Sequence, residues 1–119
     1  MIQALWIPGW HPTPLNQLTG NRHKAARLKT HDASVIAHAS LCYQLRPATG
    51  PRRVELHLVM ESGKRRCDGD AYSKSLRDGL KHAGLLIDDT PHYCRGVEPV
   101  YSKAMDGAPW GSLILLTDL

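Results

Sequence analysis

The stretch CDGDAYSK, residues 67–74, combines residue types that can hold a divalent metal ion and a phosphate group. Asp68 and Asp70 stand two positions apart, and Lys74 follows one helical turn after the second carboxylate. Mg²⁺ takes oxygen ligands, usually one or two carboxylates completed by water and phosphate. Such an ion would polarise a phosphoryl oxygen and activate a water, while Lys74 would hold the phosphate or stabilise the leaving oxygen. One interpretation of this stretch is therefore a metal site that cuts phosphodiesters.

A second acidic pair, Asp88 and Asp89, follows the apolar run LLI a short way along the chain. If the chain doubles back after the intervening helix, this pair converges with Asp68 and Asp70 around one ion; otherwise it stays on the surface. A purely structural interpretation also covers each group, with Asp70 as a helix cap, the Asp-Asp pair as an ordinary turn and Lys74 as a weak surface partner. Spacing alone leaves both interpretations open.

Hydrophobic periodicity predicts the elements that would position these groups. Residues 2–7, IQALWI, form a first strand closed by a turn with three prolines. A polar, basic and exposed loop follows over 15–29. Thr30 then caps a helix that ends before Pro47. Residues 54–60, VELHLVM, alternate between apolar and other side chains, which predicts a half-buried strand.

The second half of the chain predicts one helix and two further strands. The helix starts near Asp70 and ends at Gly84, which takes the left-handed cap position. A strand follows around residues 92–100, and a closing strand lies at 112–117. The resulting order, β-α-β-α-β-β, predicts an α/β (α+β) fold: a two-layer sandwich with two helices on a small mixed sheet.

The composition narrows the class of protein. At 119 residues, with 42% hydrophobic and 22% charged residues, the chain fits a single domain spanning 1–119. No window approaches the roughly 18 apolar residues that a membrane span requires, and the N-terminus lacks the pattern of a secretory signal. Three cysteines without CxxC spacing indicate reduced thiols. We therefore expect a cytoplasmic protein with no membrane partner and, since no nucleotide-cofactor motif occurs, no organic cofactor.

Basic residues dominate the first half of the chain. Lys and Arg total 15 against 11 Asp and Glu, and Asp32 is the one acid before Val54. This asymmetry is typical of a surface that faces a polyanion, and bases beside a metal site would position phosphate. A solvated loop is the alternative for each basic segment. Two clusters are candidates for DNA binding: Arg22, Lys24, Arg27 and Lys29, and then Lys64, Arg65 and Arg66.

Cysteine, histidine and tryptophan suggest further roles. Residue types that can bind zinc occur at His82, His92, Cys67 and Cys94. However, the His-x-Cys spacing of His92 and Cys94 fits no common structural zinc finger. Cys42 falls on the apolar face expected for the first helix, which predicts that it is buried. Trp10 and Trp110 adjoin turns and could stack on unpaired bases, with packing in the core or in a dimer as the favoured alternative.

The run KRRCDGDAYSKSLRDGLKHAGLLIDD, residues 64–89, resembles the signature of RusA-type Holliday junction resolvases. In that family a basic run leads into D-x-D, a lysine stands four positions later, and an A-G helix end precedes a D-D pair. This chain has the same elements without a gap: Asp68, Asp70, Lys74, Ala83 with Gly84, and Asp88 with Asp89. The early strand followed by PTPLN is similar to the family's N-terminal Pro and Asn, which makes Asn16 a candidate DNA contact.

The resemblance implies a homodimeric, Mg²⁺-dependent endonuclease that acts in DNA recombination and repair. It would resolve four-way (Holliday) junctions, a form of branched double-stranded DNA, by paired nicks in a bacterial or phage-infected cell. The implied metal ligands are Asp68, Asp70 and Asp89. Asp88 is an additional candidate ligand, Lys74 is the essential lysine, and Mn²⁺ is an alternative ion.

Two positions depart from the family pattern. Ala71 stands where an asparagine commonly follows the second acid, and Cys67 replaces the usual basic residue before the first. These changes remove a hydrogen bond near the metal and a phosphate contact, but they keep the ligands. The alternative function is therefore a catalytically weak or inactive DNA-binding protein of the same fold.

Overall fold

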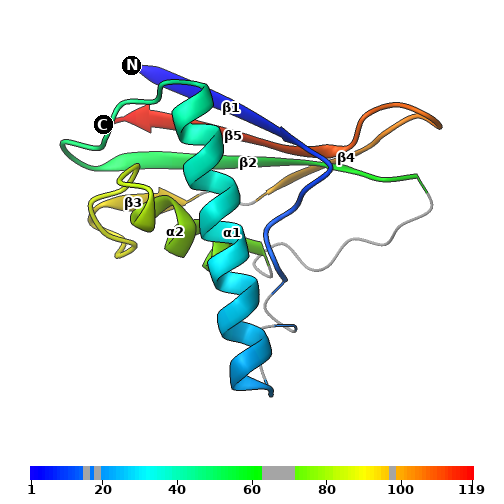
Figure 1. Ribbon diagram of the computed structural model, residues 1–119. Helices are drawn as coiled ribbons and strands as arrows, with labels where there is room; N and C mark the ends of the chain where they lie inside the picture. The colour runs from blue at the N-terminus through cyan, green and yellow to red at the C-terminus, as the bar shows by residue number, and fades with distance from the viewer. Residues whose placement is uncertain (15–16, 18–19, 63–71, 97–98) are drawn as a thin grey trace.

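The computed structural model describes residues 1–14, 17, 20–62, 72–96 and 99–119. This part of the chain forms a mixed five-stranded sheet with two helices on one of its faces (Figure 1). The predicted α+β architecture is confirmed, and two short strands follow the second helix where one was expected. In chain order the elements are β1 (Ile2–Pro8), α1 (Arg22–Cys42), β2 (Arg52–Met60), α2 (Ser73–His82), β3 (Cys94–Gly96), β4 (Val100–Lys103) and β5 (Gly111–Asp118).

β2 is the central strand of the sheet. Its neighbour β5 runs antiparallel to it and pairs in turn with β1, also antiparallel. Along its other edge, β2 pairs in parallel first with β3 and then with β4. The predicted alternation in β2 is confirmed, because the side chains of Val54, Leu56, Leu58 and Met60 are buried. One face of β2 therefore contributes its side chains to the hydrophobic core.

The two helices close this core by packing closely against each other. Ile36 of α1 is fully buried, and so is Leu80 of α2. A Cβ atom placed on Gly79 would overlap the Cδ1 atom of Ile36, so glycine is what allows α2 to approach α1 at this point. The contact fixes the direction of α2 across the sheet.

The expectation of a loop is wrong for residues 22–29, and so is the helix start at Thr30, because α1 already begins at Arg22. Residues 15–16 and 18–19 lie outside the described residues. The side chain of Asn21 caps α1 by accepting a 3.0 Å hydrogen bond from the backbone N–H of Lys24. Ala25 is the one described residue before position 32 that α1 buries, so this half lacks the apolar periodicity that marks a helix in sequence. The N-terminal half of α1 extends beyond the sheet (Figure 1).

The predictions of α2 and of its end are confirmed, whereas the helix begins at Ser73, three residues after the expected start near Asp70. The helix ends at His82, and Gly84 has a φ of +76°, the left-handed conformation expected of it. Leu85 and Leu86 of the following apolar run are buried in the core. At its start, Tyr72 takes the N-cap position without a side-chain capping bond. The expected capping role of residue 70 lies outside the described residues.

Cys42 is exposed, so the prediction that it belongs to the core is wrong. The buried stripe of α1 runs through Asp32, Ile36 and Ala39 and stops there. Cys42 instead lines an open groove between α1 and β1, because no described element covers the last turn of the helix on that side. No helix in the described part of the chain has the length and apolar character needed to cross a bilayer.

Candidate functional site

Part of the predicted site lies outside the described residues. This holds for the two carboxylates of the D-x-D motif and for the basic cluster before it. The positions concerned are Asn16, Lys64, Arg65, Arg66, Asp68 and Asp70. The structure does describe Lys74, the second acidic pair (Asp88 and Asp89) and the basic cluster of α1.

One face of α2 carries the predicted lysine and meets the second acidic pair. Lys74 is exposed in the first turn, and Lys81 lies seven residues later, two turns along the same face. The ammonium of Lys81 lies 3.1 Å from the Oδ1 atom of Asp88. The turn formed by residues 88–89 therefore sits against the face of α2 that also presents Lys74, although it contacts the opposite end of that helix.

The two acids of this turn have different surroundings. Oδ1 of Asp88 accepts a 2.9 Å hydrogen bond from the backbone N–H of Asp89, in addition to its ion pair with Lys81. The pKa of Asp88 lies below its ordinary value, mainly because of the hydrogen bond with Lys81 and secondly because of the hydrogen bond from this backbone N–H. In return, Asp88 raises the pKa of Lys81. Asp89 is half-buried, and its carboxylate forms no ion pair with any described residue. Asp89 is therefore the acid of the pair that remains available to a cation.

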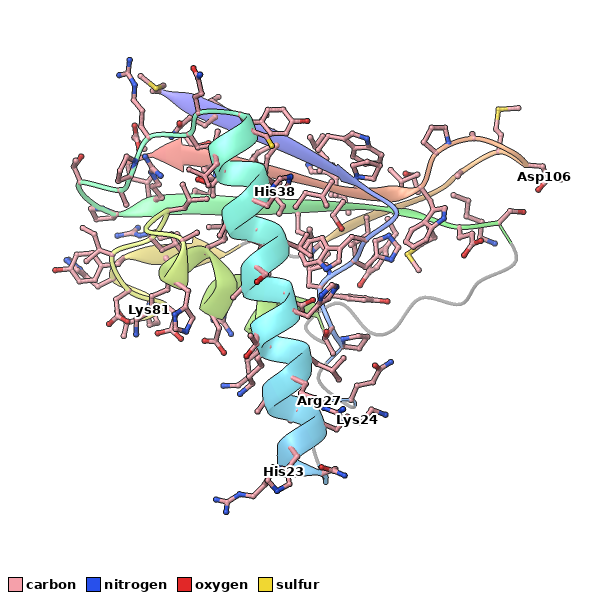
Figure 2. All side chains as sticks on the ribbon, viewed as in Figure 1. His23, Lys24, Arg27, His38, Lys81 and Asp106 are labelled. Atoms are coloured by element: carbon pink, nitrogen blue, oxygen red, sulfur yellow. The ribbon has the colours of Figure 1, made fainter. Side chains whose placement is uncertain are left out.

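The N-terminal half of α1 forms a cationic arm, defined here as residues 22–29. Its first turn contains no acid, and its basic side chains are exposed. Figure 2 shows His23, Lys24 and Arg27 together at the end of the helix that projects beyond the sheet. Free backbone N–H groups at a helix N-terminus add positive potential. The arm can therefore approach a phosphate backbone without a competing carboxylate among the described residues of its own helix, because Asp32 points into the core.

Asp32 is the centre of a buried hydrogen-bond network that sequence reasoning missed. Its side chain is 2% exposed and accepts three hydrogen bonds. The indole Nε1–H of Trp10 donates to Oδ1 at 3.0 Å, and the backbone N–H of Thr13 donates to Oδ2 at 2.8 Å. The hydroxyl of Ser75 donates to the same Oδ2 at 2.6 Å. An isolated acid in a helix usually indicates surface, but its spacing of four and seven residues from Ile36 and Ala39 was a signal that it faces inward.

This network fixes two segments that flank the predicted site. Ser75 directly follows Lys74, so its bond to Asp32 anchors the first turn of α2 and the orientation of the lysine. Trp10 and Thr13 anchor the proline-rich segment that follows β1. Trp10 is 8% exposed, which confirms packing in the core as its role.

The same proline-rich segment is also held to the sheet. The Nε2 atom of His11 lies 3.0 Å from the carbonyl oxygen of Val59 and 3.1 Å from that of Gly111, so the tautomer protonated at Nε2 donates to both. Its ring meets Trp110 edge-on, with 5.0 Å between ring centroids. Trp110 therefore packs against the body of the protein rather than standing free at a turn.

The alternative zinc cluster gains no support from the described residues. Cys94 is buried in the core, and this burial raises the pKa of its thiol. His82 and His92 are exposed, and His92 contacts the ring of Tyr93. No group of three His, Cys, Asp or Glu side chains in the described ranges is arranged to hold a metal ion.

No protein-family model matches this chain, and a comparison with curated proteins finds no significant similarity.

Proposed function

We propose that this protein is a Mg²⁺-dependent DNA endonuclease that resolves four-way junctions by paired nicks. One observation carries the proposal: α2 follows the D-x-D motif in the chain, presents Lys74 on its first turn, and meets the turn of Asp88 and Asp89 on the same face. An exposed lysine near the start of α2, and a carboxylate at Asp89 with no ion pair to a described residue at the other end of the same face, support a site for a phosphate and a divalent cation.

The donor set fits a hard ion. The ligands would be carboxylate oxygens from Asp68, Asp70 and Asp89, and oxygen is the ligand that Mg²⁺ and Mn²⁺ prefer. A bound ion supplies charge neutralisation at the scissile phosphate and an activated water. Asp88 would hold the turn in place through Lys81, with ligation as a secondary role. Lys74 would bind a non-bridging phosphate oxygen or the leaving oxygen.

The cationic arm would bind the DNA backbone. A helix with exposed basic residues and no exposed acid in its first two turns suits sequence-independent contacts with phosphate. Such contacts position a duplex without reading its bases. The predicted cluster of residues 64–66 would extend this surface next to the metal.

A junction resolvase has to cut two opposed strands, which requires two active sites. We propose that the protein acts as a homodimer in recombination and repair, in the cytoplasm of a bacterial or phage-infected cell, where its three thiols would stay reduced. Light scattering at micromolar concentration should give twice the mass of the chain. A monomer under these conditions would contradict the paired-nick geometry.

The test of the proposed function is a synthetic four-way junction incubated with and without Mg²⁺. The wild-type protein should introduce symmetric nicks in two opposed strands only when the ion is present. Asp70→Asn should abolish the nicks and keep junction binding, because the cationic arm is intact. Cleavage that persists in this variant would overturn the metal-site assignment.

A second candidate function is supported by the departures at positions 67 and 71. According to this second candidate function, the protein binds junctions through the same surface but cleaves them weakly or not at all. The variant Cys67→Arg/Ala71→Asn restores both family residues and separates the two cases. If the wild type binds tightly without cleaving in any divalent ion, and this variant cleaves, the protein is a DNA-binding relative of the nucleases.

A further inference from the structure

His38 and Cys42 form a close pair on the surface of α1. They stand four residues apart, so their side chains lie one turn apart on the same side of the helix. The Nε2 atom of His38 is 3.5 Å from the Sγ atom of Cys42, and both residues are exposed. Figure 2 shows His38 in the half of α1 that lies over the sheet, away from His23, Lys24 and Arg27 at the cationic end.

The separation of these two atoms matches the geometry of a tetrahedral zinc ion. Zinc binds thiolate sulfur at about 2.3 Å and imidazole nitrogen at about 2.0 Å. With a tetrahedral angle between the two bonds, sulfur and nitrogen lie about 3.5 Å apart. His38 and Cys42 are therefore close enough to share one ion, which would replace the hydrogen bond between their side chains.

The surroundings of the pair also suit a cation. α1 ends at Cys42, and its last turn contains no basic residue that would compensate the partial negative charge of the free carbonyl groups there. Both side chains line a groove of about 410 Å³ between α1 and β1, whose walls include Trp6, Pro8 and Tyr43. An apolar wall on one side limits the access of water to the ligands, whereas the open side leaves room for an ion and its waters.

From this geometry we propose that His38 and Cys42 form a surface site for a borderline-soft divalent ion, Zn²⁺ in the first place. The protein supplies two ligands, and water completes the tetrahedron, because no third His, Cys, Asp or Glu joins the pair among the described residues. On binding, the S–H bond breaks, the sulfur–zinc bond forms, and the proton passes to solvent. The site is independent of the proposed nuclease centre, whose oxygen ligands favour Mg²⁺.

The experiment titrates the reduced, tag-free full-length protein with Co²⁺, a spectroscopic substitute for Zn²⁺. We expect the visible bands of a tetrahedral ion and a sulfur-to-cobalt charge-transfer band, saturating at one ion per chain. Added Zn²⁺ should bleach both signals. Cys42→Ser should remove the charge-transfer band, and His38→Ala should remove the tetrahedral bands. Both residues are exposed, so both variants should fold.

His31→Ala is the matched control. His31 is exposed and lines the same groove on the same helix, seven residues before His38. At about 1.5 Å per residue it lies roughly 10 Å from His38 along the helix, too far to share the ion. This variant should bind Co²⁺ like the wild type. Absence of the charge-transfer band in the wild type, or its persistence in Cys42→Ser through another thiol, would overturn the proposal, as would unchanged tetrahedral bands in His38→Ala.

Discussion

The carboxylate of Asp32, in the middle of α1, accepts a hydrogen bond from the hydroxyl of Ser75 at the start of α2. Because the same carboxylate also accepts bonds from Trp10 and Thr13, one buried acid joins both helices to the segment that follows β1. The residue before Ser75 is Lys74, the candidate phosphate ligand. The placement of that lysine thus depends on a side chain far from it in sequence.

Replacement of Asp32 should be among the most damaging single changes in the protein. Asp32→Ala leaves three buried donors without an acceptor, and hydrogen bonds to charged groups contribute about 1.5–3 kcal/mol each. We expect a loss of roughly 3–5 kcal/mol in the free energy of unfolding, measured by urea denaturation. Ser75→Ala removes one donor and should cost about 1–2 kcal/mol. Equal effects of the two changes would show that the network is not centred on Asp32.

A side chain at position 79 requires the Cδ1 atom of Ile36 to move aside. Gly79→Ala displaces this fully buried side chain within the core, and overpacking of this kind costs about 1–3 kcal/mol. Ile36→Val removes the overlapping carbon, so the double variant should lose less stability than the sum of the two single changes. Thermal or urea unfolding of all four proteins measures this coupling. Strict additivity would mean that the helices do not meet at these residues.

Protonation of Asp118 should weaken the fold at low pH. The buried guanidinium of Arg52 donates to Asp118 at 2.7 Å and holds the pKa of this carboxyl below its ordinary value of 3.8. A depressed pKa in the folded state means that the stabilisation is complete above 3.8 and is lost as the pH falls through the lower folded value. Wild type should therefore be more stable than Asp118→Asn at neutral pH, with the difference shrinking in acid.

Urea unfolding of both proteins over a range of pH tests this expectation. Asp106→Asn is the control, because Asp106 lies in the exposed turn between β4 and β5 (Figure 2) and accepts its hydrogen bond from the hydroxyl of Ser62 rather than from Arg52. That variant should follow the wild-type pH dependence throughout. A difference between wild type and Asp118→Asn that stays constant with pH would exclude the ion pair as its source.

The cationic arm should account for part of the salt dependence of DNA binding. Each phosphate contact contributes about 0.9 to the slope of the logarithm of the binding constant against the logarithm of salt concentration. The double variant Lys24→Ala/Arg27→Ala should lower this slope by about 2 if both residues contact phosphate. Lys103→Ala, which removes an exposed lysine from β4, should leave it unchanged. Equal slopes in the wild type and in both variants would mean that the DNA does not contact the cationic arm.

Much of the fold was predictable because local signals agreed with burial. The alternation in β2 and the glycine after α2 each have one physical interpretation, and both predictions are confirmed. The start of α1 was not predictable from apolar spacing, because its first half buries little beyond Ala25 and is held by the cap at Asn21. Cys42 has the spacing of a core residue, and only the absence of a covering element in the described structure shows that it is exposed.

The candidate site was predictable to a different degree. Residue types and spacing predict the acids and the lysine as candidates, since metal and phosphate chemistry restricts which side chains can serve. Spacing could not distinguish Asp88 from Asp89, because only the fold brings Lys81 to the former. It also did not identify Asp32 as a buried acceptor, because its partners come from two segments that are distant in sequence, the one after β1 and the start of α2.

The most direct test of the nuclease proposal compares Asp89→Asn with Asp88→Asn on a four-way junction in Mg²⁺. The two variants make the same chemical change in adjacent residues. Loss of a metal ligand should reduce the cleavage rate about a hundredfold or more, whereas loss of the Lys81 partner should have a smaller effect. We predict that Asp89→Asn binds the junction but does not nick it, while Asp88→Asn still cleaves. Wild-type cleavage by Asp89→Asn would contradict the proposed metal site.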